Sequence, residues 1–190
     1  MNLTESKIGS YSYSCLMAAL RPEDAFSIVS SLTSKVSSSD IHWGDGNGAE
    51  LEPHVTVLYG LHETRPDPFI ALLGERQKFT VRIAGLSTFD GDEYDVLKLD
   101  VESPELTHLN SELRRKFKYT SKFSSYSPHI TIAYLKKGVS QRYLWLPIPL
   151  QRAVVSGYWF SSSDDAIGKV SIPCIESLAR TLLNGPGGKG

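Results

Sequence analysis

The chain contains the same heptapeptide twice, and this repeat constrains the fold more than any other feature. Residues 53–59 read PHVTVLY, and residues 128–134 read PHITIAY. Proline, histidine, threonine and tyrosine are identical, and two further positions exchange valine for isoleucine. Because both copies are rich in β-branched residues, each copy predicts a strand. Two matched strands far apart in the sequence predict a fold built from two related halves.

Side chains alternate along a strand, so each copy has two different faces. His54 and Thr56 fall on one face, and His129 and Thr131 do the same in the second copy. The apolar positions fall on the opposite face, which we expect to be buried: Val55, Val57 and Tyr59, and Ile130, Ile132 and Tyr134. Because proline cannot donate to a central ladder, each motif is expected at a strand start. A pseudo-twofold axis would then let the two polar faces meet across one cleft.

Two facing histidines suit the cleavage of a phosphodiester. Imidazole titrates near neutrality, so one ring can take a proton while the other gives one. Threonine hydroxyls can donate hydrogen bonds to phosphate oxygens as negative charge develops on them. We therefore predict four catalytic residues: His54, Thr56, His129 and Thr131. This chemistry needs no cofactor, and no metal is expected because the chain has neither an HExxH helix motif nor a cysteine cluster.

The rest of the sequence predicts an α+β protein with largely antiparallel strands. Pro22 and Pro104 each fit the first turn of a helix, and Ser103 is a typical N-cap. The helical spacing of Phe26, Val29, Leu32 and Val36 predicts one buried face, and Leu106, Leu109, Leu113 and Phe117 predict another. The element order is β-α-β-α-β-β-α-β-β-β, with a short helix expected near residues 176–183. We expect one domain over residues 1–184 and a flexible glycine-rich tail over 185–190.

Charge and cysteine content limit the partners of the chain. The 20 Lys and Arg residues are balanced by 21 Asp and Glu residues, which is unfavourable for gripping long duplex nucleic acid but allows a small anionic substrate. Cys15 and Cys174 form no CxxC pair and are expected to be buried thiols in a reducing compartment. The sequence shows no secretory signal and no apolar run long enough to span a membrane. We expect a cytoplasmic monomer or weak oligomer.

The repeated motif and its flanks resemble the two-histidine (2H), LigT-like phosphoesterase superfamily, whose signature is a pair of His-x-Thr motifs in a duplicated α+β fold. Further segments are similar to a phage and prophage branch labelled ligase-like or anti-CBASS nuclease: residues 13–17, 52–61, 94–98, 101–104, 109–110, 128–134 and 160–162. The resemblance covers roughly residues 11–174. It implies a bilobal fold with two mostly antiparallel sheets facing a central cleft and helices outside.

The resemblance also implies a reaction and a substrate class. Members act without metal on RNA-type phosphodiesters and 2′,3′-cyclic phosphates, and the anti-CBASS members cut cyclic di- and trinucleotides that trigger antiviral effectors in bacteria. One histidine would deprotonate a ribose 2′-hydroxyl, and the other would protonate the leaving 5′-oxygen. We assign the base to His54 and the acid to His129, although the symmetry of the motifs leaves the order open. Tyr13 and Trp159 are candidates for stacking on bases, and Trp43 is a weaker candidate for a lid.

Three hypotheses follow from these residues. The first is a phosphodiesterase that degrades cyclic oligonucleotide signals in a host bacterial cytoplasm. The second is an RNA-end enzyme that opens 2′,3′-cyclic phosphates or processes 2′–5′ linkages by the same chemistry. The third is a module that binds a nucleotide without cleaving it. All four motif residues are present, whereas degenerate members usually lose one of them, so we place the third hypothesis last.

Overall fold

The computed structural model of the chain describes residues 13–44, 48–121 and 123–176. The strands are β1 (Ser14–Leu20), β2 (His54–Leu61), β3 (Phe79–Asp90), β4 (Tyr94–Glu102), β5 (His129–Lys136), β6 (Arg152–Ser161) and β7 (Lys169–Pro173). The helices are α1 (Pro22–Ser31), α2 (Asp67–Leu73) and α3 (Pro104–Lys116), with 3₁₀ turns η1 (Thr33–Lys35) and η2 (Ser140–Tyr143). This is the predicted element order. Most of the helix expected over 176–183, and the whole tail over 185–190, lie outside the described residues.

All seven strands belong to one antiparallel sheet, in the order β1-β2-β5-β4-β3-β6-β7, and β1 also pairs with β6. The expectation of two separate sheets is therefore wrong. Two groups of three strands, β6-β1-β2 and β5-β4-β3, are joined at both of their borders. One border is the pairing of Val55 on β2 with Ile130 on β5, and the other is the pairing of β3 with the first part of β6.

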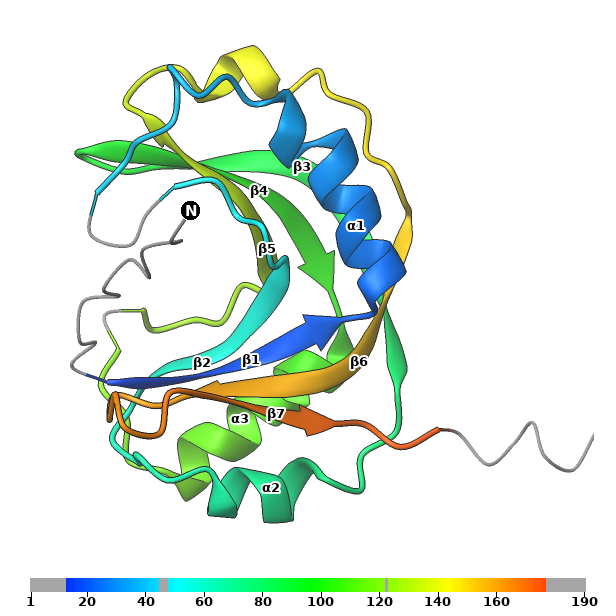
Figure 1. Cartoon of the computed structure of the whole chain (residues 1–190), viewed down its shortest axis with the longest axis vertical. Helices are drawn as coiled ribbons and strands as arrows, with labels where there is room; N and C mark the ends of the chain where they lie inside the picture. Colours follow the sequence, from blue (N-terminus) through cyan, green and yellow to red (C-terminus); the bar gives the residue numbers. More distant parts are fainter. Residues whose placement is uncertain (1–12, 45–47, 122, 177–190) are drawn as a thin grey trace, which may run out of the picture.

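The two groups repeat one plan. In each, two neighbouring antiparallel strands are connected through a helix, β1-α1-β2 in the first and β4-α3-β5 in the second. The groups meet where Val55 pairs with Ile130, which are equivalent residues of the two heptapeptides. Equivalent residues paired across antiparallel strands are related by a local twofold axis. Figure 1 shows the sheet curving strongly, with α1, α2 and α3 on its outer side.

Helix α3 covers the outer side of β2 and holds it in place. Ser103 caps the helix by accepting a hydrogen bond from the Leu106 amide at 3.2 Å. The predicted stripe is confirmed, because its leucines are buried: Leu106, Leu109 and Leu113. Asn110 is also buried, and its amide donates to the Val57 carbonyl of β2 at 2.7 Å. The helix is thereby joined directly to the first motif strand.

The buried stripe predicted for the first helix is wrong in its N-terminal part. Phe26 is 73% exposed, and the buried residues of α1 are Asp24 and Ile28, followed by Leu32 just after the helix. Asp24 is buried because its carboxylate accepts hydrogen bonds at 2.8 Å from the Val154 amide of β6 and from the Arg21 guanidinium. This link rotates the helix so that the i, i+4, i+8 positions face the sheet.

The two cysteines are free thiols. Cys174 is buried as expected, whereas Cys15 on β1 is only half-buried. Burial of the sulfur atom raises the pKa of Cys15 to about 12, although a hydrogen bond with Thr56 acts in the opposite direction. Such a thiol stays protonated at neutral pH. Among the described helices, none is both long and apolar enough to cross a membrane.

Candidate active site

The four predicted catalytic side chains lie on one face of the sheet. Residues directly opposite each other in an antiparallel pair point to the same face. Val55 and Ile130 are opposite each other, and both are completely buried under the helices. Their immediate neighbours therefore point to the opposite face of the sheet. Figure 1 shows the helices on the outer side of the curved sheet, so this opposite face is the inner one. We call this surface the motif face; it carries His54, Thr56, His129 and Thr131, each half-buried.

The strand register places each motif residue opposite a specific neighbour. On β1, Ala19 pairs with His54, and Met17 pairs with Thr56. On β4, Lys98 pairs with Thr131, and Asp100 pairs with His129. The first histidine therefore has a small apolar neighbour, and the second has a charged one.

Both motif strands contain a β-bulge at the same position of the repeat. The register between β1 and β2 skips Val57, and the register between β4 and β5 skips Ile132. These residues are equivalent, three positions after each histidine. A bulge adds one residue to one strand of a pair and increases its local twist. The repeat is thus a repeat of backbone conformation as well as of sequence.

The bulge also changes which residues are buried after it. In β2, Leu58 is 3% exposed, and Tyr59 is 47% exposed. In β5, Ala133 is completely buried, and Tyr134 is half-buried. The expectation that the tyrosines share the buried face is therefore wrong for Tyr59 and also for Tyr134, which pairs with Val96 on the face that carries Lys98. The extra residue shifts the two-residue alternation by one position.

The backbone fixes the tautomer of both motif histidines. Nδ1 of His54 lies 2.8 Å from the Glu52 carbonyl oxygen, and Nδ1 of His129 lies 2.8 Å from the Ser127 carbonyl oxygen. A carbonyl can only accept, so Nδ1 carries a hydrogen in both rings. Nε2 is then left as the atom that takes or gives a proton. Each carbonyl lies two residues before its histidine, so this support is repeated too.

Lys98 and Asp100 form a charged pair beside His129. The ammonium of Lys98 is buried, donates to the hydroxyl of Ser87 at 2.7 Å and forms an ion pair with the Asp100 carboxylate. The same ammonium lies 4.2 Å from the ring centroid of Phe89. Burial acts to raise the pKa of Asp100, but the bonds to Lys98 and Ser87 and the charge of Lys98 outweigh it and lower the pKa. Asp100 is therefore ionised near neutrality.

Burial lowers the pKa of His129 below its ordinary value. The positive charge of Lys98 and the neighbouring His54 ring act in the same direction. The hydrogen bond to the Ser127 carbonyl and the Asp100 carboxylate oppose them without restoring the ordinary pKa. The two histidines lie near each other because each directly precedes one residue of the Val55–Ile130 pair on adjacent strands. A lowered pKa means that His129 is mainly neutral at pH 7.

The surroundings of His54 are different. The Glu50 carboxylate lies 4.0 Å from its Nδ1, a distance at which it attracts a protonated imidazole. The ring of Trp159 on β6 approaches edge-on, with the centroids 6.1 Å apart. The ammonium of Lys169 on β7 lies 4.6 Å from the Trp159 ring centroid and forms an ion pair with Glu52.

Of the two predicted base-stacking residues, the structure brings only Trp159 close to a motif histidine. Tyr13 packs on the ring of His62, with the centroids 5.1 Å apart. His62 follows the far end of β2, eight residues from His54, which is roughly 25 Å along a strand. Trp43 is 65% exposed, and its indole donates to the Ser38 carbonyl at 3.4 Å.

Sequence reasoning missed the charged pair and Phe89 as parts of this site. A signal for the pair existed, because Lys98 and Asp100 are two residues apart in an otherwise apolar strand and must share a face. Phe89 gave no comparable signal. It lies at the end of β3, and its ring meets His129 edge-on, with the centroids 5.0 Å apart.

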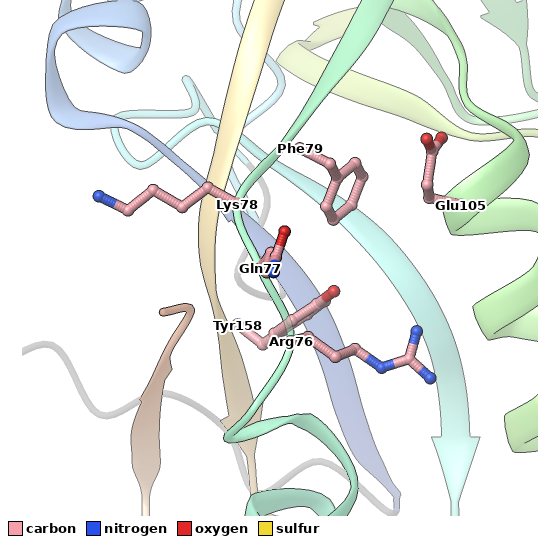
Figure 2. A pocket seen from close by; sticks show the side chains of 6 residues that line it. All are labelled: Arg76, Gln77, Lys78, Phe79, Glu105 and Tyr158. Atoms are coloured by element: carbon pink, nitrogen blue, oxygen red, sulfur yellow. The ribbon is translucent and has the colours of Figure 1, made fainter. Parts of the chain in front are cut away.

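A cavity of about 280 Å³ lies elsewhere, where α2 leads into β3. It is lined by Arg76, Gln77, Lys78, Phe79, Glu105 and Tyr158 (Figure 2). Tyr158 is adjacent to Trp159 in β6 and therefore points to the opposite face of the sheet. The Arg76 guanidinium is held by the Glu112 carboxylate at 2.6 Å. This cavity contains none of the motif residues. Within the part of the chain that the structure describes, no group of three His, Cys, Asp or Glu side chains could hold a metal ion.

Comparison with known proteins identifies the family of the chain. The family model described as the 2′-5′ RNA ligase superfamily matches residues 22–156, which include both motifs and more than two thirds of the chain. A search of curated protein sequences found no match. Among solved structures, E. coli LigT complexed with 3′-AMP is similar, with a TM-score of 0.56 and 15% identity. The match covers 85% of this chain and 93% of LigT.

Two further structures share the fold. One is described only as a phosphoesterase and has a TM-score of 0.57 and 14% identity, over 85% of this chain and 94% of its own. The other is Kluyveromyces marxianus Usb1 with uridine monophosphate, with a TM-score of 0.51 and 12% identity, over 86% of this chain and 99% of Usb1. Since the family model spans most of the chain and both histidine motifs, the chain belongs to the 2′-5′ RNA ligase superfamily and is an enzyme of the 2H phosphoesterase type.

Proposed function

We propose that the chain is a metal-independent phosphodiesterase that cleaves the 3′,5′ linkages of cyclic di- or trinucleotides by histidine acid–base catalysis. The observation that carries this proposal is the pair of matched motifs about a local twofold axis, with His54 and His129 on one face and both Nδ1 atoms bound to carbonyls. Two Nε2 atoms are thereby available for proton transfer at one phosphate.

In the proposed reaction, a neutral histidine takes the proton of a ribose 2′-hydroxyl, and the 2′-oxygen attacks the neighbouring phosphorus. The P–O5′ bond breaks, and a protonated histidine gives its Nε2 proton to the leaving 5′-oxygen. The products are a 2′,3′-cyclic phosphate and a 5′-hydroxyl, and water then opens the cyclic phosphate. Thr56 and Thr131 donate hydrogen bonds to the non-bridging phosphate oxygens.

We assign the base to His129 and the acid to His54, which reverses the order expected from the sequence. The lowered pKa of His129 supports this order, because a base must be neutral before the reaction. His54 then takes the role of the acid, as the second imidazole on the motif face.

The choice of cyclic oligonucleotides is supported by the segments that resemble the phage branch and by the near-neutral charge of the chain, which is unfavourable for a long polyanion. In a host bacterial cytoplasm, this activity would remove an antiviral signal.

The family match favours a second candidate, an RNA-end 2′,3′-cyclic phosphodiesterase or 2′–5′ processing enzyme. The related LigT and Usb1 structures contain the mononucleotides 3′-AMP and uridine monophosphate.

Product analysis in EDTA separates the two candidates. The chain is incubated with a 3′,3′-linked cyclic dinucleotide and, in competition, with a short RNA that ends in a 2′,3′-cyclic phosphate. We expect linear products from the cyclic dinucleotide. Turnover of the RNA end alone would reject the first proposal in favour of the second. Loss of all turnover in EDTA, with recovery on adding a divalent ion, would reject the metal-independent mechanism.

A further inference from the structure

Each half of the motif face contains the same set of three side chains: a histidine, an aromatic ring edge-on to it, and a lysine over that ring. In one half these are His129, Phe89 and Lys98. In the other half they are His54, Trp159 and Lys169. The aromatic residues and lysines are not part of the heptapeptide repeat. They come from different strands in the two halves, and the aromatic residue is phenylalanine in one half and tryptophan in the other.

Both aromatic rings lie on the motif face. Ser87 pairs with Lys98, which shares a face with Thr131, and Phe89 is two residues after Ser87 on β3. On the other side, Trp159 pairs with Met17, which in turn pairs with Thr56. Because paired residues share a face and alternate residues do too, both rings face the same side as the histidines.

The ring contacts and the pairing of β2 with β5 order these groups along the face as Trp159, His54, His129 and Phe89. A phosphodiester between two nucleosides has a matching order, in which a base and ribose lie on each side of the phosphorus. A phosphate held between the histidines would therefore place one nucleoside toward each ring.

Phe89 is 42% exposed, although the buried Lys98 ammonium lies against its ring. The Lys98 ammonium can cover only one ring face, so the rest of the ring stays open to solvent. An aromatic face open to solvent offers a stacking surface for a nucleobase, and such stacking is worth about 1–3 kcal/mol per base.

We propose that Phe89 and Trp159 are paired nucleobase platforms, one on each side of the scissile phosphate, so that the substrate is a phosphodiester flanked by two nucleosides rather than a terminal mononucleotide phosphate. This inference rests on the proposed function, because it takes the histidines as the position of the phosphate. It adds Phe89 as a second substrate-binding ring and makes the bases on both sides part of recognition.

The test measures binding of a ligand that cannot be cleaved. The deoxydinucleotide d(ApA) lacks the 2′-hydroxyl, and its binding to the full chain is followed by NMR titration in EDTA, with deoxyadenosine 3′-monophosphate as the one-base ligand. The variants are Phe89→Ala, Trp159→Ala and Phe89→Tyr. Phe26→Ala is the matched control, since Phe26 is an exposed phenylalanine on α1.

We expect Phe89→Ala and Trp159→Ala each to weaken d(ApA) binding roughly tenfold or more, as loss of one stacked base predicts. For the mononucleotide, only one of the two variants should weaken binding. Phe89→Tyr should retain binding because it keeps the ring. The proposal is overturned if d(ApA) fails to bind, or if Phe89→Ala binds it as tightly as Phe26→Ala does. If d(ApA) binding depends on both rings but a 3′,3′-linked cyclic dinucleotide is not cleaved, the proposed catalysis is rejected while the base-stacking role of the two rings stands.

Discussion

His54 and His129 begin equivalent strands with equivalent bulges, and each donates its Nδ1 hydrogen to the carbonyl two residues earlier, yet their neighbours differ. His54 faces Ala19 across the ladder and has the Glu50 carboxylate 4.0 Å from Nδ1. His129 faces Asp100 and lies near the buried Lys98 ammonium. The backbone arrangement is therefore shared between the halves, while the charges around each imidazole are not.

This difference shows how a duplicated motif can provide both a general acid and a general base. The repeated backbone presents two Nε2 atoms in related positions, which geometry alone makes interchangeable. The surrounding charges remove that equivalence, since the lowered pKa of His129 favours a neutral ring on one side of the axis. Acid and base roles thus depend on residues outside the repeat.

The largest effect is expected from removing either imidazole. His54→Ala and His129→Ala should each lower kcat by about 10²–10⁴-fold, because general acid–base catalysis is typically worth that much per group. Steady-state rates on the cleaved dinucleotide provide the measurement. His108→Ala is the control, since His108 is exposed on α3. A near-normal rate in either motif variant would contradict the catalytic role of the histidine that was replaced.

The halves should differ in stability just after the shared tyrosine. Gly60 follows Tyr59 with φ +89°, and a Cβ there would lie 1.8 Å from the Thr120 carbonyl oxygen. The equivalent residue of the second copy is the fully buried Leu135. Gly60→Ala should therefore lower the free energy of unfolding by about 2–4 kcal/mol, combining a strained φ with a backbone clash.

Urea denaturation measures this change, and Gly138→Ala is the matched control. Gly138 has φ +82° but no atom within 4 Å of a built Cβ, so its substitution should cost only the strained φ, about 1–2 kcal/mol. Equal losses in both variants would show that the close approach of Thr120 to Gly60 contributes nothing.

A smaller effect is expected for the two hydroxyls. Thr56→Val and Thr131→Val keep the shape of the side chain but remove one neutral hydrogen bond to the phosphate, so kcat should fall by roughly tenfold. Comparing the two variants shows whether the halves contribute equally. A loss as large as that of the histidine variants would give threonine a role beyond a single hydrogen bond.

The smallest effect is a shift in the pH dependence, and it tests the difference between the halves most specifically. With His129 as base, kcat/KM should rise with pH through the lowered pKa of His129, so the acid limb lies below its ordinary value of 6.5. Lys98→Met removes a positive neighbour, which raises that pKa and moves the limb to higher pH. Asp100→Asn removes a negative neighbour and moves the limb to lower pH.

The expected displacement is under about one pH unit in each direction, since each neighbour is one of several influences on the ring. Melting temperature verifies that both variants are folded. Shifts in the same direction, or no shift in either variant, would contradict His129 as the base.

The element order and the shared face of the four motif residues could be predicted, because β-branched runs, helix caps and strand alternation are local signals. The position of Tyr59 could not be predicted, because the bulge at Val57 depends on pairing with β1. The buried side of α1 could not either, since the hydrogen bond from Val154 to Asp24 joins residues 130 positions apart. The single continuous sheet likewise depends on long-range pairings, of β2 with β5 and of β3 with β6.

Within the site, the four motif residues and Trp159 could be predicted from the sequence, but the remaining residues could not. Phe89 becomes part of it because the pairing of β3 with β4 and of β4 with β5 brings its ring to His129. Tyr13 lies far from His54, because it is at the opposite end of the β1–β2 pair.

The central claim is that both imidazoles act on one phosphate, and an NMR titration with a nucleoside 3′-monophosphate in EDTA tests it most directly. The ring signals of His54 and His129 are assigned with the two alanine variants and followed as the ligand is added. The account predicts that both sets of signals shift together, with one Kd and a stoichiometry of one nucleotide per chain. A shift at only one histidine, or two independent binding curves, would contradict it.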